Sequence, residues 1–455
     1  MSGRRSAFPR SAAVHPAGKG GPLTSTDHRF GATVLVLFLM AIAPARAQER
    51  APPPDVVDLP AVLQLVRDVS PRLSIERQAV VGAEANRITA GAFPNPILNY
   101  GRYRPSGGQA TLFDGSRQEQ ATFEVPLLIA GQRSARIEKA EREIEAARAR
   151  VASGTSSLSA EAGAAFVALL AAQEKAALLS EANEELVRLR GIVAGREASG
   201  MASRYDLTRL DVELGAFRAK FDEAKAEISD RAGNLAVLLG LPKWRPSASG
   251  NLSPLVLGAY SLANPRDHAD ASPATITALR EETVAQSSVE VARRERWPVP
   301  SVSAGRVWTG DPFGAANFLG LSIEIPILDT RRGPLAKAEA EAATATLRRE
   351  LAMAEVAANL ERFASVIAAR QAALQRFQQE ASARLPALKQ MAEDAYRLGR
   401  GSIFELLDST RSRYDLYQTR IDLVAALYEA QLRFLAVSGE LERSVGLMVP
   451  EPGRR

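Results

Sequence analysis

The sequence has no cysteine among its 455 residues. This absence excludes a disulfide framework, a thiol nucleophile, a cysteine metal site and a lipid-modified N-terminal cysteine. Histidine is scarce as well, because only His268 follows the first 47 positions. His268 lies in a proline- and aspartate-rich segment, where we expect a solvated loop residue. With one such imidazole and no thiolate, selective binding of soft metals by this chain is not expected.

The short motifs of the common enzyme classes are also missing. The sequence has no P-loop, no H-E-x-x-H, no G-x-S-x-G and no histidine placed to act as a base. An enzyme is therefore the function class that the sequence supports least. We expect no catalytic residue, no metal site and no cofactor.

Excess positive charge is confined to one end of the chain. The formal net charge is +5, and residues 1–47 hold six Lys or Arg and one acid. The rest of the chain is therefore neutral overall. Since no basic surplus remains there, the composition does not support binding of nucleic acid.

The same N-terminal segment has the pattern of a secretory signal. The apolar run Gly31–Ala43 follows Arg29 and precedes the sequence Ala-Arg-Ala at 45–47. We expect cleavage after Ala47. The alternative is an uncleaved membrane anchor, but a run of 13 residues is too short to span a bilayer as a helix.

Three landmarks occur twice, in the same order. "FPNPILNYG" at 93–101 corresponds to "WPVPSVSAG" at 297–305, and "FEVPLL" at 123–128 corresponds to "IEIPIL" at 323–328. The third pair comprises Gly200, Ser203, Asp206 and Leu207, which match Gly399, Ser402, Glu405 and Leu406. The spacings are 204, 200 and 199 residues, which indicates an internal duplication.

The duplication predicts the domain organisation. We expect a signal peptide at 1–47, a first repeat at 48–250, a linker at 251–270, a second repeat at 271–447 and a tail at 448–455. Each repeat reads as a helix, a strand pair and a long helical hairpin. A proline-free helix from near Gln132 to Ser199 would be about 100 Å long. Pro386 is expected to kink its counterpart.

The expected strands alternate between apolar and polar residues. Leu319, Leu321, Ile323 and Ile325 share one side of the fourth strand, and Ala121, Phe123 and Val125 share one side of the second. Aromatic residues gather near the strand ends: Tyr100, Tyr103, Phe113, Trp297, Trp308 and Phe313. Such strands suit a transmembrane barrel or, equally, a small soluble sheet. Four strands cannot close a barrel, so a membrane role requires several chains.

The chain resembles the TolC-like outer membrane efflux family from about Leu59 to Leu447. The resemblance rests on "FPNPILNYG", "FEVPLLIAGQRSARIEKAE" at 123–141, "IEIPILDTRRGPLAKAEAEA" at 323–342 and "YRLGRGSIFELLDSTRSRY" at 396–414. The block at 323–342 is most similar to the heavy-metal, or cation efflux, branch. The resemblance implies a mainly α fold with a β-barrel part.

In this family three chains share a 12-stranded transmembrane β-barrel, and their long antiparallel helices form a periplasmic α-barrel. The resemblance therefore implies a homotrimer in the outer membrane with a large periplasmic portion, in contact with outer membrane lipid. It also implies a passive exit duct for metal cations or drugs. The implied partners are a periplasmic adaptor (membrane fusion) protein and an inner-membrane pump of the RND type. The alternative is a secreted coiled-coil scaffold or periplasmic adaptor without a pore.

The resemblance also assigns residues. Adaptor contacts would lie at two hairpin tips, formed by Gly200, Met201, Ala202 and Ser203, and by Gly399, Arg400, Gly401 and Ser402. Glu405, Asp408, Tyr396 and Arg400 would form the periplasmic gate. This chain has Gly401 where the family pattern has an arginine, which places the closing salt bridge in doubt.

A structural role competes with the gate role at Glu405. Ser402 and Glu405 form an S-x-x-E capping box, and Ser203 and Asp206 have a similar form. Glu405 can therefore serve as a helix cap, as a gate residue, or as both. Asp408 lies beyond the first helical turn, where capping no longer explains an acid.

Overall fold

The computed structural model describes residues 52–103, 118–257, 264–309 and 314–446. The described elements belong to the unit Pro53–Arg455. The expected signal peptide at 1–47, the tail at 448–455 and the aromatic residues Phe113 and Phe313 lie outside the described residues. The helices are α1 Leu59–Val69, α2 Pro71–Gly91, α3 Gln132–Ala198, α4 Arg204–Leu238, η1 Pro265–His268, α6 Pro273–Arg294, α7 Arg332–Glu380, η2 Ser382–Arg384, α8 Leu385–Arg397, α9 Ile403–Ser438 and α10 Leu441–Ser444.

Prolines divide the helical stretches where the backbone cannot continue. The 67-residue α3 confirms the predicted long helix. The kink expected at Pro386 is also confirmed, since α7 ends at Glu380 and α8 begins with Pro386 in its first turn. Pro71 similarly separates α1 from α2, where the sequence pattern predicted a single helix before the strand pair.

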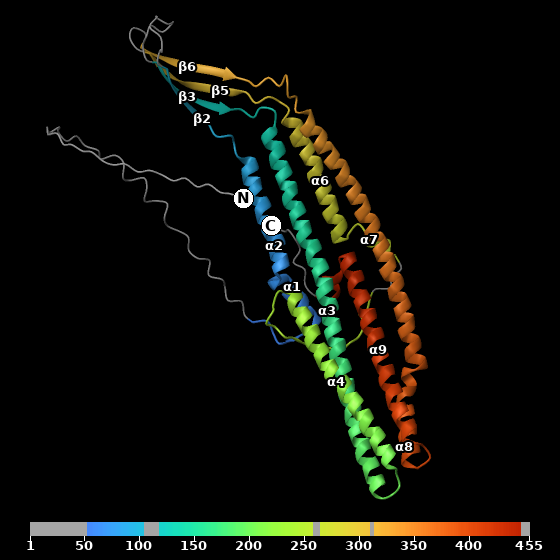
Figure 1. Ribbon diagram of the computed structural model, residues 1–455. Coiled ribbons are helices and arrows are strands. Elements are labelled where there is room, and N and C mark those ends of the chain that lie inside the picture. The colour runs from blue at the N-terminus through green and yellow to red at the C-terminus, as the bar shows by residue number, and fades with distance from the viewer. Residues whose placement is uncertain (1–51, 104–117, 258–263, 310–313, 447–455) are drawn as a thin grey trace, which may run out of the picture. The chain divides into compact units, whose positions relative to one another are not determined.

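The helices lie side by side, with α3 at the centre of the contacts. Along its first half α3 packs against α2 and α6, and along its second half it packs against α4 and α9 (Figure 1). Helix α7 in turn packs against α6 and α9. Alanines such as Ala146, Ala162 and Ala236 are fully buried in these contacts, because a methyl group lets helices approach closely.

Among the described helices, α3 alone contains an 18-residue window apolar enough to cross a membrane. That window is 61% buried by neighbouring helices. The apolar residues of α3 therefore form a packing core.

The described strands form two sheets. Strands β2 Ile97–Tyr103, β3 Gln118–Pro126, β5 Ser301–Thr309 and β6 Ala315–Ser322 make one antiparallel sheet in the order β2-β3-β5-β6. The short strands β1 Val56–Val57 and β4 Ser247–Ala248 pair in parallel. Gly305 is required in β5, since a Cβ there would lie 2.1 Å from the backbone oxygen of Ala121.

The fourth strand is shorter than the alternation predicted. β6 ends at Ser322, so Ile323 and Ile325 lie outside it. The reason is the partner segment: β5 begins at Ser301, and Pro298 and Pro300 before it have no N–H to donate to a ladder.

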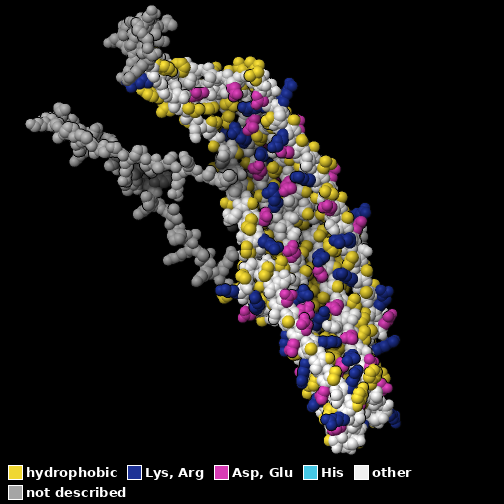
Figure 2. Space-filling view, in the orientation of Figure 1, with side chains coloured by type: hydrophobic (Ala, Val, Ile, Leu, Met, Phe, Trp, Pro, Cys, Tyr) yellow, Lys and Arg dark blue, Asp and Glu magenta, His cyan; other side chains and the backbone are white. Residues whose placement is uncertain are grey.

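The apolar side of the four-stranded sheet is the exposed side. Leu98 pairs with Phe123 in register, and Ala304 pairs with Leu319, so these side chains point to one face. Phe123 is 57% exposed and Leu319 is 79% exposed, whereas Thr122 on the opposite face is 4% exposed. Apolar side chains also gather over the strands in Figure 2, while charges of both signs cover the helices. A soluble sheet would bury its apolar side instead.

His268 differs from its expectation as a solvated loop residue. It ends the short helix η1, and its Nδ1 lies 3.5 Å from Oε1 of Glu440. Its side chain is 17% exposed, because η1 packs against α7 and brings the imidazole next to the segment that follows α9.

Candidate functional site

The two segments expected to form hairpin tips are tight turns between antiparallel helices. Gly200 between α3 and α4 has φ 75°, and Gly399 between α8 and α9 has φ 70°. The amide of Met201 donates to the carbonyl of Arg196 at 2.8 Å, and the amide of Arg400 donates to that of Ala395 at 2.9 Å. Only glycine takes the left-handed conformation without strain, which explains its recurrence at both turns.

Both helices that leave the tips begin with a complete capping box. The amide of Ser402 donates to Oε2 of Glu405 at 3.2 Å, and the amide of Glu405 donates to Oγ of Ser402 at 3.3 Å. Ser203 and Asp206 make the corresponding pair at 3.0 and 3.1 Å. The capping role of Glu405 is therefore confirmed, and its carboxylate stays exposed on α9.

Asp408 lies one turn further along α9 and is also exposed. Within the described part of the chain, neither Glu405 nor Asp408 forms an ion pair with a lysine or arginine. The charge of Asp408 does contribute to the raised pKa of Arg411, although the main cause is the hydrogen bond from Arg411 to Glu213. Two acids of α9 thus face solvent close to the second tip.

Tyr396 is not exposed at the tip. It is buried in a hydrophobic cluster with residues of α3, α4 and α9. The guanidinium of Arg196, in the last turn of α3, lies 5.0 Å from the Tyr396 ring and donates to its carbonyl at 2.8 Å. Burial raises the pKa of Tyr396, and the nearby charge of Arg196 opposes that shift. Tyr396 therefore joins the two hairpins within one chain.

The remaining tip residues differ in their surroundings. Arg400 is exposed and, among the residues that the structure describes, pairs with no acid. At Gly401 a Cβ would lie 3.1 Å from Oε2 of Glu405, so this glycine leaves room for the capping carboxylate. Met201 is 67% exposed at the first tip.

A buried ion cluster, which the sequence did not predict, joins the hairpins further from the tips. Glu185 of α3 accepts from Nζ of Lys389 on α8 at 2.9 Å and from Nη2 of Arg413 on α9. Glu185 and Arg413 are each 8% exposed. A second pair joins α4 to α9, where Nε of Arg411 donates to the buried Glu213 at 2.6 Å.

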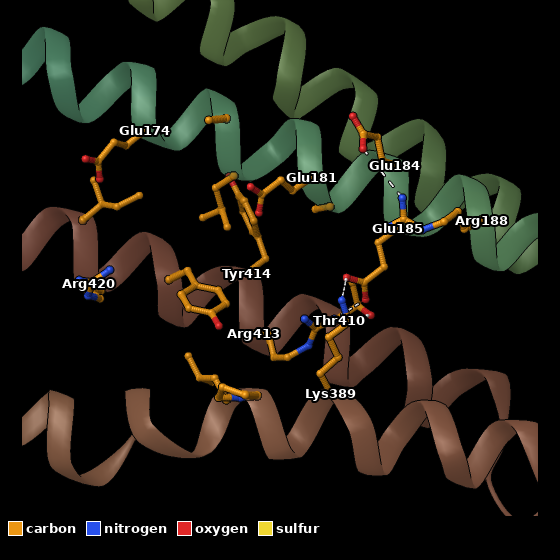
Figure 3. A pocket seen from close by; sticks show the side chains of 17 residues that line it. Glu174, Glu181, Glu184, Glu185, Arg188, Lys389, Thr410, Arg413, Tyr414 and Arg420 are labelled. Carbon is orange, nitrogen blue, oxygen red and sulfur yellow. Dashed lines mark hydrogen bonds and ion pairs between the residues drawn. The ribbon is translucent and has the colours of Figure 1, made fainter. Parts of the chain in front are cut away.

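The Glu185 cluster lies at one end of a groove of about 740 Å³ between α3, α8 and α9. Figure 3 shows Glu185, Lys389 and Arg413 converging there, with Glu174 and Arg420 at the other end. The acids that line the groove lie on α3, and its basic residues lie on α8 and α9, apart from Arg188 of α3. In the part of the chain that the structure covers, no group of three His, Cys, Asp or Glu could hold a metal ion.

Tyr414 is buried beside this groove and packs edge-on against Phe217 of α4, with ring centroids 5.4 Å apart. Among the described residues, its hydroxyl has no hydrogen-bond partner. Burial raises the pKa of Tyr414 to about 12, with smaller contributions from Asp415 and Asp422.

The residues that join the hairpins were not predicted, because the sequence around them carries little local information about their contacts. Arg196 is a basic residue in the last turn of α3, a position that favours contact with helix carbonyls and that sequence reasoning can recognise. Glu185 and Glu213 have no such marker, because their partners lie about 200 residues away in the sequence.

The chain is similar in sequence to curated proteins and in fold to solved structures. No model of a known protein family matches the chain. The chain is 30% identical over 345 residues to the nickel-cobalt-cadmium resistance protein NccC of Alcaligenes xylosoxydans xylosoxydans, covering 74% of each chain. It is 25% identical over 406 residues to the cobalt-zinc-cadmium resistance protein CzcC of Cupriavidus metallidurans, covering 88% of this chain and 90% of CzcC. Among solved structures, the outer-membrane channel OprN aligns with a TM-score of 0.66 and 21% identity, over 84% of this chain and 90% of OprN.

Proposed function

The chain belongs to the TolC-like family of outer membrane efflux proteins, in its heavy-metal branch, and from this premise we propose that divalent metal cations are its cargo. The protein is an outer membrane efflux channel with a large periplasmic portion. The observation that supports the cargo is its likeness to NccC and CzcC, whose names describe resistance to nickel, cobalt, zinc and cadmium.

The channel conducts passively, as one component of a three-part efflux system. The chain has no cysteine, and its described residues offer no metal-binding group, so selection of the metal falls to the inner-membrane pump. That pump is of the RND type in this proposal. A periplasmic adaptor joins it to the turns at 200–203 and 399–402.

Three copies assemble into one channel in this proposal. The four-stranded sheet leaves β2 and β6 as open edges, and its apolar side is exposed. Open edges are not stable in lipid, so β6 of one copy pairs with β2 of the next. Three sheets of four strands then close a twelve-stranded barrel.

The outer face of α7 supports the same assembly. Exposed apolar residues follow one another at spacings of three and four along this helix, at Ala340, Ala343, Leu347, Leu351 and Ala354. Such a stripe is typical of a helix that packs against a second helix. We assign it to the interface with the neighbouring copy, and name it the α7 seam.

Glu405 and Asp408 form the periplasmic gate in this proposal, together with Tyr396 and Arg400. Acids from three copies would approach one axis and create a negative ring, which favours cations over anions. Repulsion between like charges is reduced when a divalent cation occupies the ring.

Single-channel conductance in planar bilayers tests the gate. We expect the variant Glu405→Gln/Asp408→Asn to lose cation selectivity and to open more widely. Glutamine preserves the capping box, so the helix start is retained. Asp415→Asn is the matched control, because Asp415 is another exposed acid of α9. Equal selectivity in all three proteins would contradict the gate.

Metal tolerance tests the cargo. Deletion of this chain in its host should lower growth in nickel, cobalt, zinc or cadmium, and the full chain supplied in trans should restore it. A strain whose metal tolerance is unchanged, while its tolerance to organic toxicants falls, would assign the channel a different cargo.

A further inference from the structure

All four connections between strands and long helices lie at the same end of the sheet. α2 leads into β2, β3 leads into α3, α6 leads into β5, and β6 leads into α7. Because the neighbouring strands are antiparallel, these connections are adjacent. They mark the boundary between the sheet and the helices (Figure 1).

Arginine side chains link each connection to the next. Nε of Arg133 donates to the carbonyl of Gly91 at 2.7 Å, and Nη1 of Arg294 donates to that of Ala130 at 3.4 Å. Nη1 of Arg331 donates to the carbonyl of Glu295 at 2.6 Å. A guanidinium has five N–H donors, and the carbonyl oxygen does not use all of them. Further donors on each arginine therefore remain for another acceptor.

Positive charge is in excess at this boundary. The segments 91–97, 126–136, 290–301 and 322–334 contain seven arginines and four acids. Several of the arginines are already engaged: Arg293 and Arg294 pair with Glu290, and Arg136 lies 4.0 Å from Glu295. Arg296 and Arg332 are exposed and form no ion pair within the described residues.

Large apolar side chains stand exposed in the same four segments. Phe93 is 71% exposed, and the Arg133 guanidinium lies 4.5 Å from the centre of its ring. Trp297 is 62% exposed directly after Arg296. Others are Ile129, Ile325, Ile327 and Leu328. Aromatic rings and arginines side by side are typical of the interface between lipid chains and headgroups.

We propose that this boundary, the arginine collar formed by Arg133, Arg294, Arg296, Arg331 and Arg332, binds the phosphate groups of anionic phospholipids in the inner leaflet of the outer membrane. The collar would lie at the periplasmic face of the membrane, since the sheet enters the lipid and the helices extend into the periplasm. This inference rests on the proposed function, because it requires the sheet to be a membrane barrel.

The chemistry favours a phospholipid over other anions. The guanidinium fork matches two phosphate oxygens, and the neighbouring apolar side chains match the acyl chains of the same molecule. Each arginine close to an anionic leaflet is expected to strengthen binding about fivefold. Arg296 and Arg332 are the best probes, since neither one supports a neighbouring connection.

The test uses the full-length protein in detergent, titrated with phosphatidylglycerol or with neutral phosphatidylcholine and read by native mass spectrometry. We expect the wild type to prefer phosphatidylglycerol, and Arg296→Gln/Arg332→Gln to bind it about 30-fold more weakly. The matched control is Arg348→Gln/Arg376→Gln, which removes two exposed arginines from α7 further from the sheet. This control should bind phosphatidylglycerol as the wild type does.

Three outcomes would overturn the proposal: no preference for phosphatidylglycerol in the wild type, an equal loss in both double variants, or displacement of the lipid by millimolar inorganic phosphate. Conductance of every variant in planar bilayers separates this result from the proposed function. A conducting wild type without lipid preference rejects the collar alone. A wild type that inserts but does not conduct rejects the channel itself.

Discussion

Arg413 and Tyr414 are adjacent on α9, yet they join that helix to different elements. Arg413 donates to Glu185 of α3, and Tyr414 packs against Phe217 of α4. Both are nearly fully buried. Two neighbouring residues of α9 therefore attach the second hairpin to both helices of the first, one by an ionic contact and one by an aromatic contact.

Removing the guanidinium of Arg413 should destabilise the folded protein. Arg413→Leu leaves the buried Glu185 with Lys389 as its remaining partner, and we expect a loss of about 3 kcal/mol in the free energy of unfolding. Urea denaturation followed by circular dichroism measures it. Arg420→Leu is the control, because Arg420 is exposed on the same groove and should change stability by less than about 0.5 kcal/mol. Equal losses of stability in Arg413→Leu and Arg420→Leu would contradict a stabilising role of the Glu185 cluster.

The raised pKa of Tyr414 predicts an alkaline loss of stability. The pKa of Tyr414 is about 12 in the folded chain and 10 for an unperturbed tyrosine, so the unfolded chain releases this proton at lower pH. Its contribution is complete below pH 10 and is lost as the pH rises toward 12. Tyr414→Phe should reduce this loss, and it also removes a buried hydroxyl that has no partner in the described part of the chain.

Thermal unfolding between pH 9 and about pH 12, with tyrosinate absorbance, measures the effect. Tyr205→Phe is the control, because Tyr205 is 73% exposed and should leave the alkaline profile unchanged. Tyr396 and Tyr428 also have raised pKa values, so part of the alkaline loss should persist in Tyr414→Phe. If the alkaline loss of stability is the same in Tyr414→Phe as in the wild type, Tyr414 does not contribute to it.

Among the elements, the turns follow from sequence most directly. Gly200 and Gly399, and the capping pairs that follow them, were recognised from local patterns and are found in those roles. The length of β6 was not recognised, because it depends on the prolines of a neighbouring strand segment.

Two glycine substitutions should change the free energy of unfolding in opposite directions. Gly399→Ala places a side chain at φ 70° and should cost about 1 kcal/mol, although space is available. Gly195→Ala lies inside α3 with nothing near its Cβ, and should gain about 0.5–1 kcal/mol. Thermal denaturation of the two variants measures the difference. Stabilisation by both would mean that the second tip does not require the left-handed conformation.

At the scale of the whole molecule, two apolar surfaces of a single copy need a partner other than water: lipid for the sheet, and a neighbouring copy for α7. The α7 seam and the apolar side of the sheet are exposed in a single copy. We expect Leu347→Glu/Leu351→Glu to lower the trimer fraction at least about tenfold, because each leucine contributes about 1.5 kcal/mol or more when buried. Light scattering of the detergent-solubilised protein measures the trimer fraction.

Val256→Glu is the control for the seam, since Val256 is fully exposed outside the helices and should leave assembly unchanged. A trimer that withstands both glutamates on α7 would place the interface on another face.

The long helices, the alternation in the strands, the glycine turns and the capping boxes followed from the sequence alone. Each depends on residues within a few positions of one another, through helix hydrogen bonding, strand alternation and backbone conformation. Glu405 and Asp408 could therefore be placed on α9 in advance.

Which side chains meet across the hairpins depends on the tertiary structure. Glu185 and Arg413 are 228 positions apart, and Arg196 and Tyr396 are 200 apart. Their contact depends on the position of α3 along its axis relative to α8 and α9. A shift of α3 by one helical turn would bring different side chains together, and no local sequence pattern specifies this position. The arginine collar has the same origin. Arg133 lies in α3, Arg294 and Arg296 lie at the end of α6 and just after it, and Arg331 and Arg332 lie at the start of α7. The antiparallel sheet brings these segments together.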